Sequence, residues 1–255
     1  MKEVETMISV ITVCYNSKDT IRDTIESVLN QDYVNVEHII IDGGSTDETL
    51  SIVNEYQRNE MQVVSEPDEG IYDAINKGIA LSIGSVISIL NSDDHFVDET
   101  VLSQIMEKFS LAQDADCVLC GVDFFRGNNQ DAIVRRFGVK YFHPLLMRFG
   151  IMPPHPGSFF RSNVYKDYGV YDNSFQICGD FDFFVRVILK NKITYTKIHG
   201  PVVKMKLGGM STRGIKSFIQ ITNEFNSSLR KHGFISSVFF LWLRLPFRLL
   251  QLRPF

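Results

Sequence analysis

The chain has 255 residues, of which 44% are hydrophobic and 22% are charged, and its formal net charge is −4. This length and composition are ordinary for a globular protein with one large α/β domain or two small ones. The weak negative charge argues against non-specific binding to nucleic acid.

The first half of the chain alternates strand-like and helix-like segments. Apolar runs rich in β-branched residues predict strands over Met7–Cys14, Val36–Ile41, Met61–Val64 and Val86–Leu90. Apolar residues at helical spacing predict helices over Thr20–Leu29, Asp47–Tyr56, Gly70–Leu81 and Thr100–Phe109. This order predicts an α/β fold with a mostly parallel central sheet and helices on both of its faces.

The second half is less regular. Two strand-like runs joined through a Gly-Asn-Asn turn predict a small antiparallel hairpin over Cys117–Phe125 and Ala132–Phe137. Further on, the pattern predicts a helix, a strand broken at Gly200-Pro201 and a longer helix, over Asp180–Lys190, Ile193–Leu207 and Gly214–His232. Because no clear linker interrupts this order, we expect one domain over residues 1–211, followed by a helical segment over 212–255.

The cysteines and the start of the chain point to a reducing compartment. Four cysteines are too few for a disulfide scaffold of this length. Cys117 and Cys120 have CxxC spacing, but on a strand these positions face opposite ways, which argues against a shared metal or redox pair. Residues 1–6 are polar and no cleavage-like site follows, so we expect no signal peptide.

Polar side chains follow each predicted parallel strand, at the edge where such sheets bind ligands. These residues are Tyr15, Asn16, Asp42, Asp68, Asp93 and Asp94. Adjacent carboxylates at the end of a buried strand repel each other and lose hydration, so Asp93 and Asp94 need a partner. A divalent cation shared with a phosphate is one explanation, and capping of the following helix is the other.

Asp42 and Asp68 each have two possible roles, one in ligand binding and one in local structure. Asp42 precedes two glycines and could accept the N3–H of a uracil, or simply satisfy backbone N–H groups of its own turn. Asp68 could contact a ribose or sugar hydroxyl, or favour the positive end of the next helix. In that helix Asn76 and Lys77 are further candidates, although most of their face is expected to be solvated.

Three residues of the second half are candidates for the acceptor side of a reaction. His155 lies in a proline-rich loop, where it is a structural residue or a hydrogen-bond partner of a sugar or phosphate. Asp180 and Asp182 open a helix, where acids commonly serve only as dipole partners. Because positions i and i+2 of a helix diverge, one of these two could face a cleft as a general base while the other faces solvent.

The end of the chain has a different character. Every charged residue after Glu224 is basic, and the run from Phe234 to Leu243 carries Phe and Trp. The run is too short to span a bilayer, which needs roughly 20 apolar residues. It suits the surface of an anionic membrane, and the alternatives are packing on the core or a dimer contact.

Together these residues resemble the family-2 inverting glycosyltransferases of the GT-A fold, from Ile8 to about Leu189. Four blocks carry the resemblance: Ser9–Asn16, Glu37–Asp47, Asn91–Asp94 and Gly179–Asp182. No block is decisive alone, but their order and spacing are highly specific. The segment Ser65–Gly78 is similar to the branch that builds bacterial surface polysaccharides.

The resemblance implies a role for each candidate. Tyr15, Asn16, Asp42, Asp68, Asn76 and Asp93 would bind the nucleotide-sugar donor, Asp94 would ligate Mn²⁺ or Mg²⁺, Asp180 would be the catalytic base, and His155 and Asp182 would bind the acceptor.

Three positions depart from the family pattern. Asn91 stands where many members carry an extra Asp, Ile75 where Arg is frequent, and Gly179 where Glu is common. The cation site therefore has one charge less, and neutralisation of the diphosphate must rely on the metal or another cation.

The expected function is transfer of a sugar, with inversion, from a nucleoside-diphosphate sugar to a glycan or polyprenyl-diphosphate-linked acceptor in polysaccharide, capsule or O-antigen biosynthesis. UDP is the expected nucleotide, and residues 234–255 would hold the protein on the inner face of the plasma membrane, on the cytoplasmic side. The alternatives are a nucleotidyltransferase and a non-catalytic scaffold on a transferase fold. A nucleotidyltransferase is disfavoured because no Gly-rich, basic phosphate loop follows the first strand.

Overall fold

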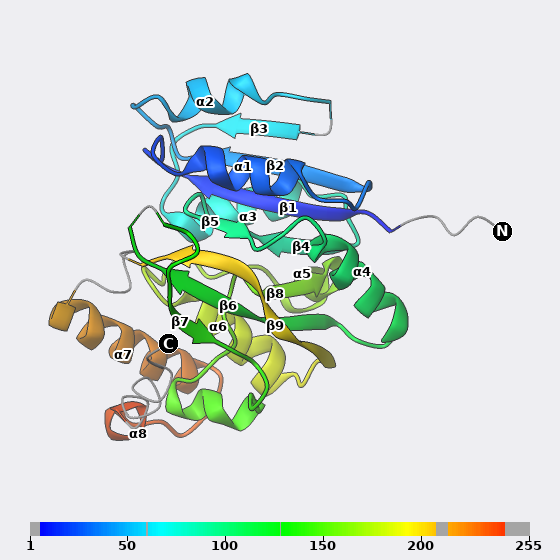
Figure 1. The fold of residues 1–255 in the computed structure, drawn as a ribbon. Helices are drawn as coiled ribbons and strands as arrows, with labels where there is room; N and C mark the ends of the chain where they lie inside the picture. The colour runs from blue at the N-terminus through cyan, green and yellow to red at the C-terminus, as the bar shows by residue number, and fades with distance from the viewer. Residues whose placement is uncertain (1–5, 60, 128, 208–213, 243–255) are drawn as a thin grey trace.

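The computed structural model describes residues 6–59, 61–127, 129–207 and 214–242. In these residues one sheet of nine strands is flanked by helices (Figure 1). The strands are β1 (Ile8–Cys14), β2 (Val36–Asp42), β3 (Met61–Ser65), β4 (Val86–Ile89), β5 (Asp94–Phe96), β6 (Cys117–Phe125), β7 (Ile133–Phe137), β8 (Ser158–Arg161) and β9 (Tyr195–Lys206). The helices are α1 (Ile21–Leu29), α2 (Thr49–Glu55), α3 (Ile71–Leu81), α4 (Val101–Leu111), η1 (Pro144–Phe149), α5 (Ser162–Tyr168), α6 (Gly179–Phe184), η2 (Val185–Lys190), α7 (Gly214–Lys231) and α8 (Val238–Trp242).

The first half of the sheet is parallel, as its strand–helix alternation predicts. β3, β2, β1 and β4 lie side by side in that order, and all three pairs are parallel. In the register, Cys14 pairs with Asp42 and Asp42 pairs with Ser65, so the first three strands end level with one another. The loops that follow them therefore meet at one edge, where the candidate donor residues were expected.

The antiparallel part of the sheet is larger than the predicted hairpin. The hairpin of β6 and β7 is confirmed, but β8 is also inserted antiparallel between β4 and β6, and β5 pairs antiparallel with β9. β5 and β8 have only three and four residues, too few for a periodic pattern to be read. The predicted break at Gly200-Pro201 coincides with a register shift between β6 and β9 around Gly121.

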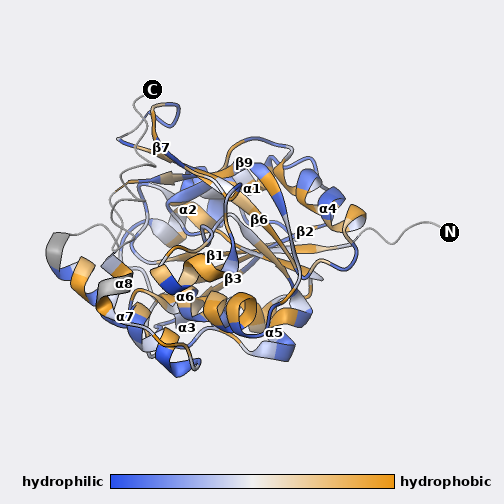
Figure 2. Ribbon diagram, turned by 90° about the horizontal axis from the view of Figure 1, so that it is seen from below, coloured by the Kyte–Doolittle hydropathy of each residue, from blue (hydrophilic) through white to orange (hydrophobic). Residues whose placement is uncertain are grey.

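The core lies on both faces of the sheet. A large cluster covers the face next to α3, α6 and α7, and a second cluster covers the face next to α4. Cys117 belongs to the first cluster and Cys120 to the second, as strand alternation predicts. Peripheral helices such as α4 and α7 change from apolar to polar around their circumference (Figure 2), which is the pattern of helices packed on a sheet by one face.

The C-terminal helices α7 and α8 pack against α6 and η1, at the end of the molecule opposite β3 (Figure 1). The ring of Phe225 on α7 stacks on Phe181 of α6 with 3.8 Å between centroids, and Leu229 and Leu241 are fully buried. The predicted domain boundary at 211/212 falls outside the described residues. Among the described helices, none combines the length and the apolar character that crossing a membrane requires.

Candidate active site

The loops after β1, β2 and β3 bring three of the predicted donor residues together. A Cβ atom on Gly43 would lie 2.3 Å from Asp68 Oδ2 and 3.5 Å from the Tyr15 ring. Gly43 is therefore required for this close approach. Tyr15 is 62% exposed, so its ring is available to stack on a planar ligand. The Asp68 side chain also accepts a 2.9 Å hydrogen bond from the N–H of Gly70, at the start of α3.

Asp42 is fully buried beneath this group. Its carboxylate accepts hydrogen bonds from the N–H groups of Gly44 and Ser45, at 3.2 and 3.0 Å, and from the hydroxyls of Ser45 and Ser65. These are the bonds expected of a carboxylate that holds its own turn. A direct contact of Asp42 with a base stays a prediction, and such a contact would have to displace one of these donors.

Asn16 joins the first of these loops to the second. Its backbone is left-handed, with φ of 48°, and its Oδ1 accepts a 2.8 Å hydrogen bond from the N–H of Thr46. Next to it, Ser17 Oγ lies 2.8 Å from Ser92 Oγ, which connects the loop after β1 to the loop after β4. The Asn16 side chain thus holds the loop after β1 against the loop after β2, and its amide oxygen is used by this backbone contact.

The two adjacent carboxylates after β4 point to opposite sides. β5 begins at Asp94, which shares one face of this strand with Phe96, while Asp93 in the preceding turn lines a cavity together with His95 on the other side. Asp94 is only 1% exposed, and its Oδ2 accepts a 3.0 Å hydrogen bond from Asn91 Nδ2. Neither Asp93 nor Asp94 caps a helix, since a strand follows them, and the alternative of capping is therefore wrong.

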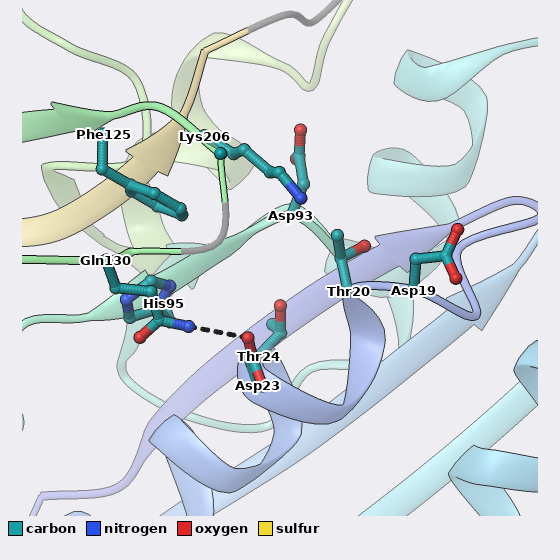
Figure 3. A pocket seen from close by; sticks show the side chains of 10 residues that line it. Asp19, Thr20, Asp23, Thr24, Asp93, His95, Phe125, Gln130 and Lys206 are labelled. Carbon is teal, nitrogen blue, oxygen red and sulfur yellow. Dashed lines mark hydrogen bonds between the residues drawn. The ribbon is translucent and has the colours of Figure 1, made fainter. Parts of the chain in front are cut away.

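Asp93 and His95 line a cavity of about 440 Å³ between α1 and the β6–β7 hairpin (Figure 3). The other lining residues are Asp19, Thr20, Asp23, Thr24, Phe125, Gly127, Gln130 and Lys206. Gln130 Nε2 donates a 2.7 Å hydrogen bond to Asp23, which ties the hairpin to α1 across the cavity. Asp94 and Asp180 are not among the residues that line this cavity.

Burial controls the charge of both carboxylates. It raises the pKa of Asp93, although the nearby Lys206 ammonium lowers that pKa. It raises the pKa of Asp94 much further, and the neighbouring charge of Asp93 acts in the same direction. Asp93 is therefore the carboxylate of the pair that faces the cavity with a cation beside it, whereas Asp94 is enclosed, and burial together with the charge of Asp93 disfavours its ionised form.

Asp180 lies in the first turn of α6 and is partly buried. Its Oδ1 accepts a 2.7 Å hydrogen bond from the N–H of Phe181 and lies 3.5 Å from the hydroxyl of Tyr72. Burial raises the pKa of Asp180 to about 6, against the effect of these two hydrogen bonds. Such a carboxylate is ionised at neutral pH and has a higher proton affinity than an ordinary aspartate, which suits a general base.

Asp182 does not face solvent or a cleft, and the prediction that it binds the acceptor needs correction. Its carboxylate is fully buried, 2.9 Å from Nε2 of His232 and 3.3 Å from Nζ of Lys231. Arg186 adds a third, longer contact at 3.5 Å. Burial alone would raise the pKa of Asp182, but the hydrogen bond and charge of His232 and the charge of Lys231 lower it. Asp182 thus anchors α6 to the end of α7.

Asn76 and His155, predicted on the donor and acceptor sides, both contact Tyr171 instead. Asn76 bonds the backbone N–H and C=O of Tyr171 at 2.9 and 2.8 Å, which uses its amide to hold this loop. His155 Nε2 lies 2.8 Å from the hydroxyl of Tyr171, and burial lowers its pKa to about 4. The Tyr171 ring in turn stacks on Tyr72, which contacts Asp180. These residues support the surroundings of Asp180 and leave no free polar group for a ligand at Asn76.

Sequence reasoning missed the neighbours of these carboxylates. Tyr72 is buried although its helix face was expected to be solvated, and Glu224 lies on a helix 44 residues after Asp180. Lys206 ends a strand whose pairing could not be read from the chain. For Tyr72 an apolar neighbour at helical spacing, Ile75, was an available signal. For Glu224 and Lys206 no local pattern existed.

Two departures from the family pattern have structural explanations. A Cβ on Gly179 would lie 2.8 Å from the Tyr72 ring, so Tyr72 occupies the space that a side chain at 179 would need. Ile75 is 1% exposed and packs in the core, so it leaves no charge at the sheet edge.

The described residues fit a divalent cation that is bound jointly by protein and substrate. In the described part of the chain no group of three or more His, Cys, Asp or Glu could hold a metal ion. Mg²⁺ is commonly bound by one or two carboxylates together with substrate phosphates and water. The carboxylate of Asp93 at the cavity wall fits that kind of site, whereas Asp94 is enclosed, and its predicted role as metal ligand stays a prediction.

The family model described as glycosyl transferase family 2 matches residues 9–179. An uncharacterized glycosyltransferase of Mycobacterium tuberculosis is 34% identical over 187 residues, which cover 71% of this chain and 69% of that protein. The Escherichia coli protein WfaP, named as a UDP-Glc:alpha-D-GlcNAc-diphosphoundecaprenol beta-1,3-glucosyltransferase, is 37% identical over 100 residues, which cover 39% of this chain and 40% of WfaP.

Solved structures show the same fold. Staphylococcus aureus TarS 1–349 in complex with UDP-GlcNAc superposes with a TM-score of 0.68 at 19% identity, over 88% of this chain and 66% of that one. The mannosyltransferase PcManGT of Pyrobaculum calidifontis, in complex with GDP-Man and Mn²⁺, gives 0.66 at 15% identity, over 95% and 71%. With its parallel sheet edge and the family match over more than half its length, the chain belongs to glycosyltransferase family 2 and is a glycosyltransferase of the GT-A fold.

Proposed function

We propose that the protein transfers a sugar, with inversion, from a UDP-sugar to a glycan or polyprenyl-diphosphate-linked acceptor, with Asp180 as the general base. The observation that carries this proposal is the placement of Asp180, partly buried in the first turn of α6, with its Oδ1 held by the N–H of Phe181 at 2.7 Å and 3.5 Å from the hydroxyl of Tyr72. Burial also raises the pKa of this carboxyl to about 6. Asp180 removes the proton of the acceptor hydroxyl as its oxygen attacks the anomeric carbon, and the nucleoside diphosphate leaves from the opposite side. General-base catalysis contributes about 10²–10⁴-fold.

The donor lies along the edge formed by the ends of the parallel strands. The exposed ring of Tyr15 stacks on the base, and Asp68 contacts a ribose hydroxyl, while Asp42 fixes the turn beneath them. Support for UDP comes from the names of WfaP and the TarS complex, whereas PcManGT was solved with GDP-Man.

The diphosphate lies toward Asp93, where Lys206 supplies a positive charge on the cavity wall. We place the cation on Asp93 rather than on Asp94, because only Asp93 lines the cavity. A bound Mg²⁺ or Mn²⁺ would stabilise the charge on the departing diphosphate. PcManGT, a relative by fold, was solved with Mn²⁺. Asp94 contributes by bonding Asn91, which fixes the loop that presents Asp93.

The base is tested by release of nucleoside diphosphate from a panel of nucleotide sugars with Mn²⁺, read by chromatography. Asp180→Asn should reduce release by at least about 100-fold, since it removes the base. Calorimetry should find unchanged donor binding, because Asp180 is not among the donor residues. The matched control is Asp114→Asn, an exposed acid after α4 that should behave as wild type. Near-normal turnover in Asp180→Asn would refute the base.

The protein also docks on an anionic membrane surface through the segment after α7. Within 234–242, Leu241 is fully buried and Phe234 packs on the core, but Ile235 is 84% and Trp242 54% exposed. The predicted run thus divides into a core-facing and an outward-facing part. Basic residues flank it in the sequence, and cations near apolar side chains favour anionic lipid.

The docking test uses vesicles of phosphatidylglycerol and of phosphatidylcholine, with co-sedimentation as the readout. Ile235→Ser combined with Trp242→Ser should reduce binding to the anionic vesicles only, and leave the thermal unfolding midpoint within a few degrees of wild type. Removal of the whole segment is a poor test, because it would expose the core beneath Leu241. Equal sedimentation of the double variant and wild type would rule out this surface.

The acceptor is a saccharide linked to polyprenyl diphosphate, presented at the cytoplasmic face of the membrane. The name of WfaP supports this acceptor class, since it specifies a GlcNAc-diphosphoundecaprenol substrate. The two alternative functions, a nucleotidyltransferase and a non-catalytic scaffold, receive no support from the family match.

A further inference from the structure

The start of α6 is held by a side chain of another helix. Cys178 precedes α6 and makes no side-chain cap. Instead Oε2 of Glu224, on α7, accepts hydrogen bonds from the N–H groups of Ile177 and Cys178, at 3.0 and 2.8 Å. These donors belong to the two residues that lie just before Gly179 and Asp180. Because unpaired N–H groups gather at helix starts, a carboxylate there fixes the backbone from which Asp180 projects.

Glu224 is itself held in place. Gln220, one turn earlier on α7, donates a 3.0 Å hydrogen bond to Oε1 of Glu224 and a 2.8 Å hydrogen bond to Gln176. Below this contact the rings of Phe181 and Phe225 stack, so α6 and α7 are packed as well as bonded. The position of Glu224 relative to α6 is therefore defined by several independent contacts.

We propose that Glu224 is a positioning residue for Asp180, which fixes the start of α6 and places a negative charge next to the catalytic carboxylate. This inference rests on the proposed function, in which Asp180 is the base. Glu224 raises the proton affinity of Asp180, and its charge adds to the effect of burial on the pKa of that carboxyl. Glu224 thus affects both the position of Asp180 and the proton affinity of its carboxylate.

Other groups facing Asp180 from the described residues do not supply this charge. Tyr72 on α3 and Tyr171 are neutral, because burial raises the pKa of both hydroxyls well above the ordinary value. Asp182, on α6 itself, is charged but is matched by Lys231 and His232. Glu224 is the acidic side chain whose charge acts on Asp180 without such a match.

The variant Glu224→Gln separates the two parts of the proposal. A glutamine can place its carbonyl oxygen where Oε2 lies and accept the same two N–H groups, but it carries no charge. Its amide nitrogen then replaces Oε1, so Gln220 must turn its own amide oxygen toward residue 224 to keep a hydrogen bond there. Loss of the charge makes ionised Asp180 more favourable, so the acid limb of the kcat/KM–pH profile should move to lower pH while the plateau rate is largely kept. Glu224→Ala also loses the hydrogen bonds, and its plateau rate should fall by about 10–100-fold as the base is misplaced.

The profiles are measured on release of nucleoside diphosphate by the full-length chain. The control Glu107→Gln removes one charge from an exposed position on α4 and should leave the limb unchanged. Titration of the ¹³C-labelled Asp180 carboxyl by NMR, in wild type and in Glu224→Gln, gives the same information without turnover. A merely structural Glu224 would change stability but not the limb or the NMR midpoint.

The outcomes separate this inference from the function on which it rests. If Glu224→Gln folds and its limb and NMR midpoint coincide with those of wild type, Glu224 does not act on Asp180, and the base assignment is untouched. If Asp180→Asn retains full turnover, the base assignment is wrong, whatever the NMR midpoint of Glu224→Gln shows.

Discussion

Asp94 on β5 and Asp182 on α6 are both enclosed carboxylates, yet their surroundings shift their pKa values in opposite directions. Asp94 has an amide and a second carboxylate near it, and its pKa is raised. Asp182 has Lys231 and His232, and its pKa is lowered. A buried carboxylate without a cation gives up its charge, whereas one with cations keeps it as an anchor. Each enclosed residue leaves its close neighbour, Asp93 or Asp180, to face ligands.

The largest expected effect is a loss of stability when Asp182 is replaced. Asp182→Ala should lower the free energy of unfolding by about 2–4 kcal/mol, because it removes a fully buried carboxylate that His232, Lys231 and Arg186 contact and leaves the enclosed His232 ring without its partner. Asp94→Asn should change it by less than about 1 kcal/mol, since an amide replaces a carboxyl that favours its neutral form. Urea unfolding at neutral pH compares the two. Equal losses would remove the distinction between the two sites.

The next effect concerns the cost in stability of the raised pKa of Asp180, the proposed base. Its folded pKa of about 6 lies above the value near 4 of an unfolded chain. Between these values the folded state binds more protons, so the free energy of unfolding falls as pH rises from about 4 to about 6. Asp180→Asn removes this loss and should stabilise the protein by about 1–3 kcal/mol above pH 6. Thermal unfolding at pH 4 should show no gain, and a gain there would contradict the linkage.

Ligand binding can separate the roles of the adjacent carboxylates Asp93 and Asp94 at the start of β5. Asp93→Asn should weaken cation-dependent donor binding by about 10–100-fold, because it removes the carboxylate at the cavity wall. Asp94→Asn should keep most of that dependence. Calorimetric titration of the donor with and without Mn²⁺ measures both. A loss confined to Asp94→Asn would return the cation to Asp94.

The smallest expected effect tests the packing next to Asp180. In Gly179→Ala the new Cβ would lie 2.8 Å from the Tyr72 ring, and the ring must shift. We expect a loss of about 1–3 kcal/mol of stability and a lower rate. Tyr72→Ala combined with Gly179→Ala should restore part of the stability that Gly179→Ala loses on its own, measured as a double-mutant cycle. Strict additivity would show that the ring is not the obstacle.

The sequence predicted well those features that a few neighbouring residues determine. Alternation and helical spacing located β1 to β4 and the loops that carry Tyr15, Asp42 and Asp68, because each element holds its own pattern. Alternation also separates Asp93 from Asp94, but only when β5 is known to be a strand, and three residues are too few to reveal it.

Features made by distant segments were not predictable. Asp180 receives its environment from Tyr72, 108 residues before it, and from Glu224 on α7. The anchoring of Asp182 by His232 also joins positions 50 residues apart. Such contacts arise from packing of the two halves on one another, and no local spacing encodes them.

The four cysteines, all free and buried, give the molecule a set of internal reporters. Cys14 lies at the end of β1, beside the proposed donor residues, Cys178 lies just before α6, and Cys117 and Cys120 lie in β6. An alkylating reagent can reach each thiol only when its surroundings open. Pulse labelling followed by peptide mass spectrometry would therefore measure separately how fast the surroundings of Cys14 and of Cys178 open, in the unmodified enzyme.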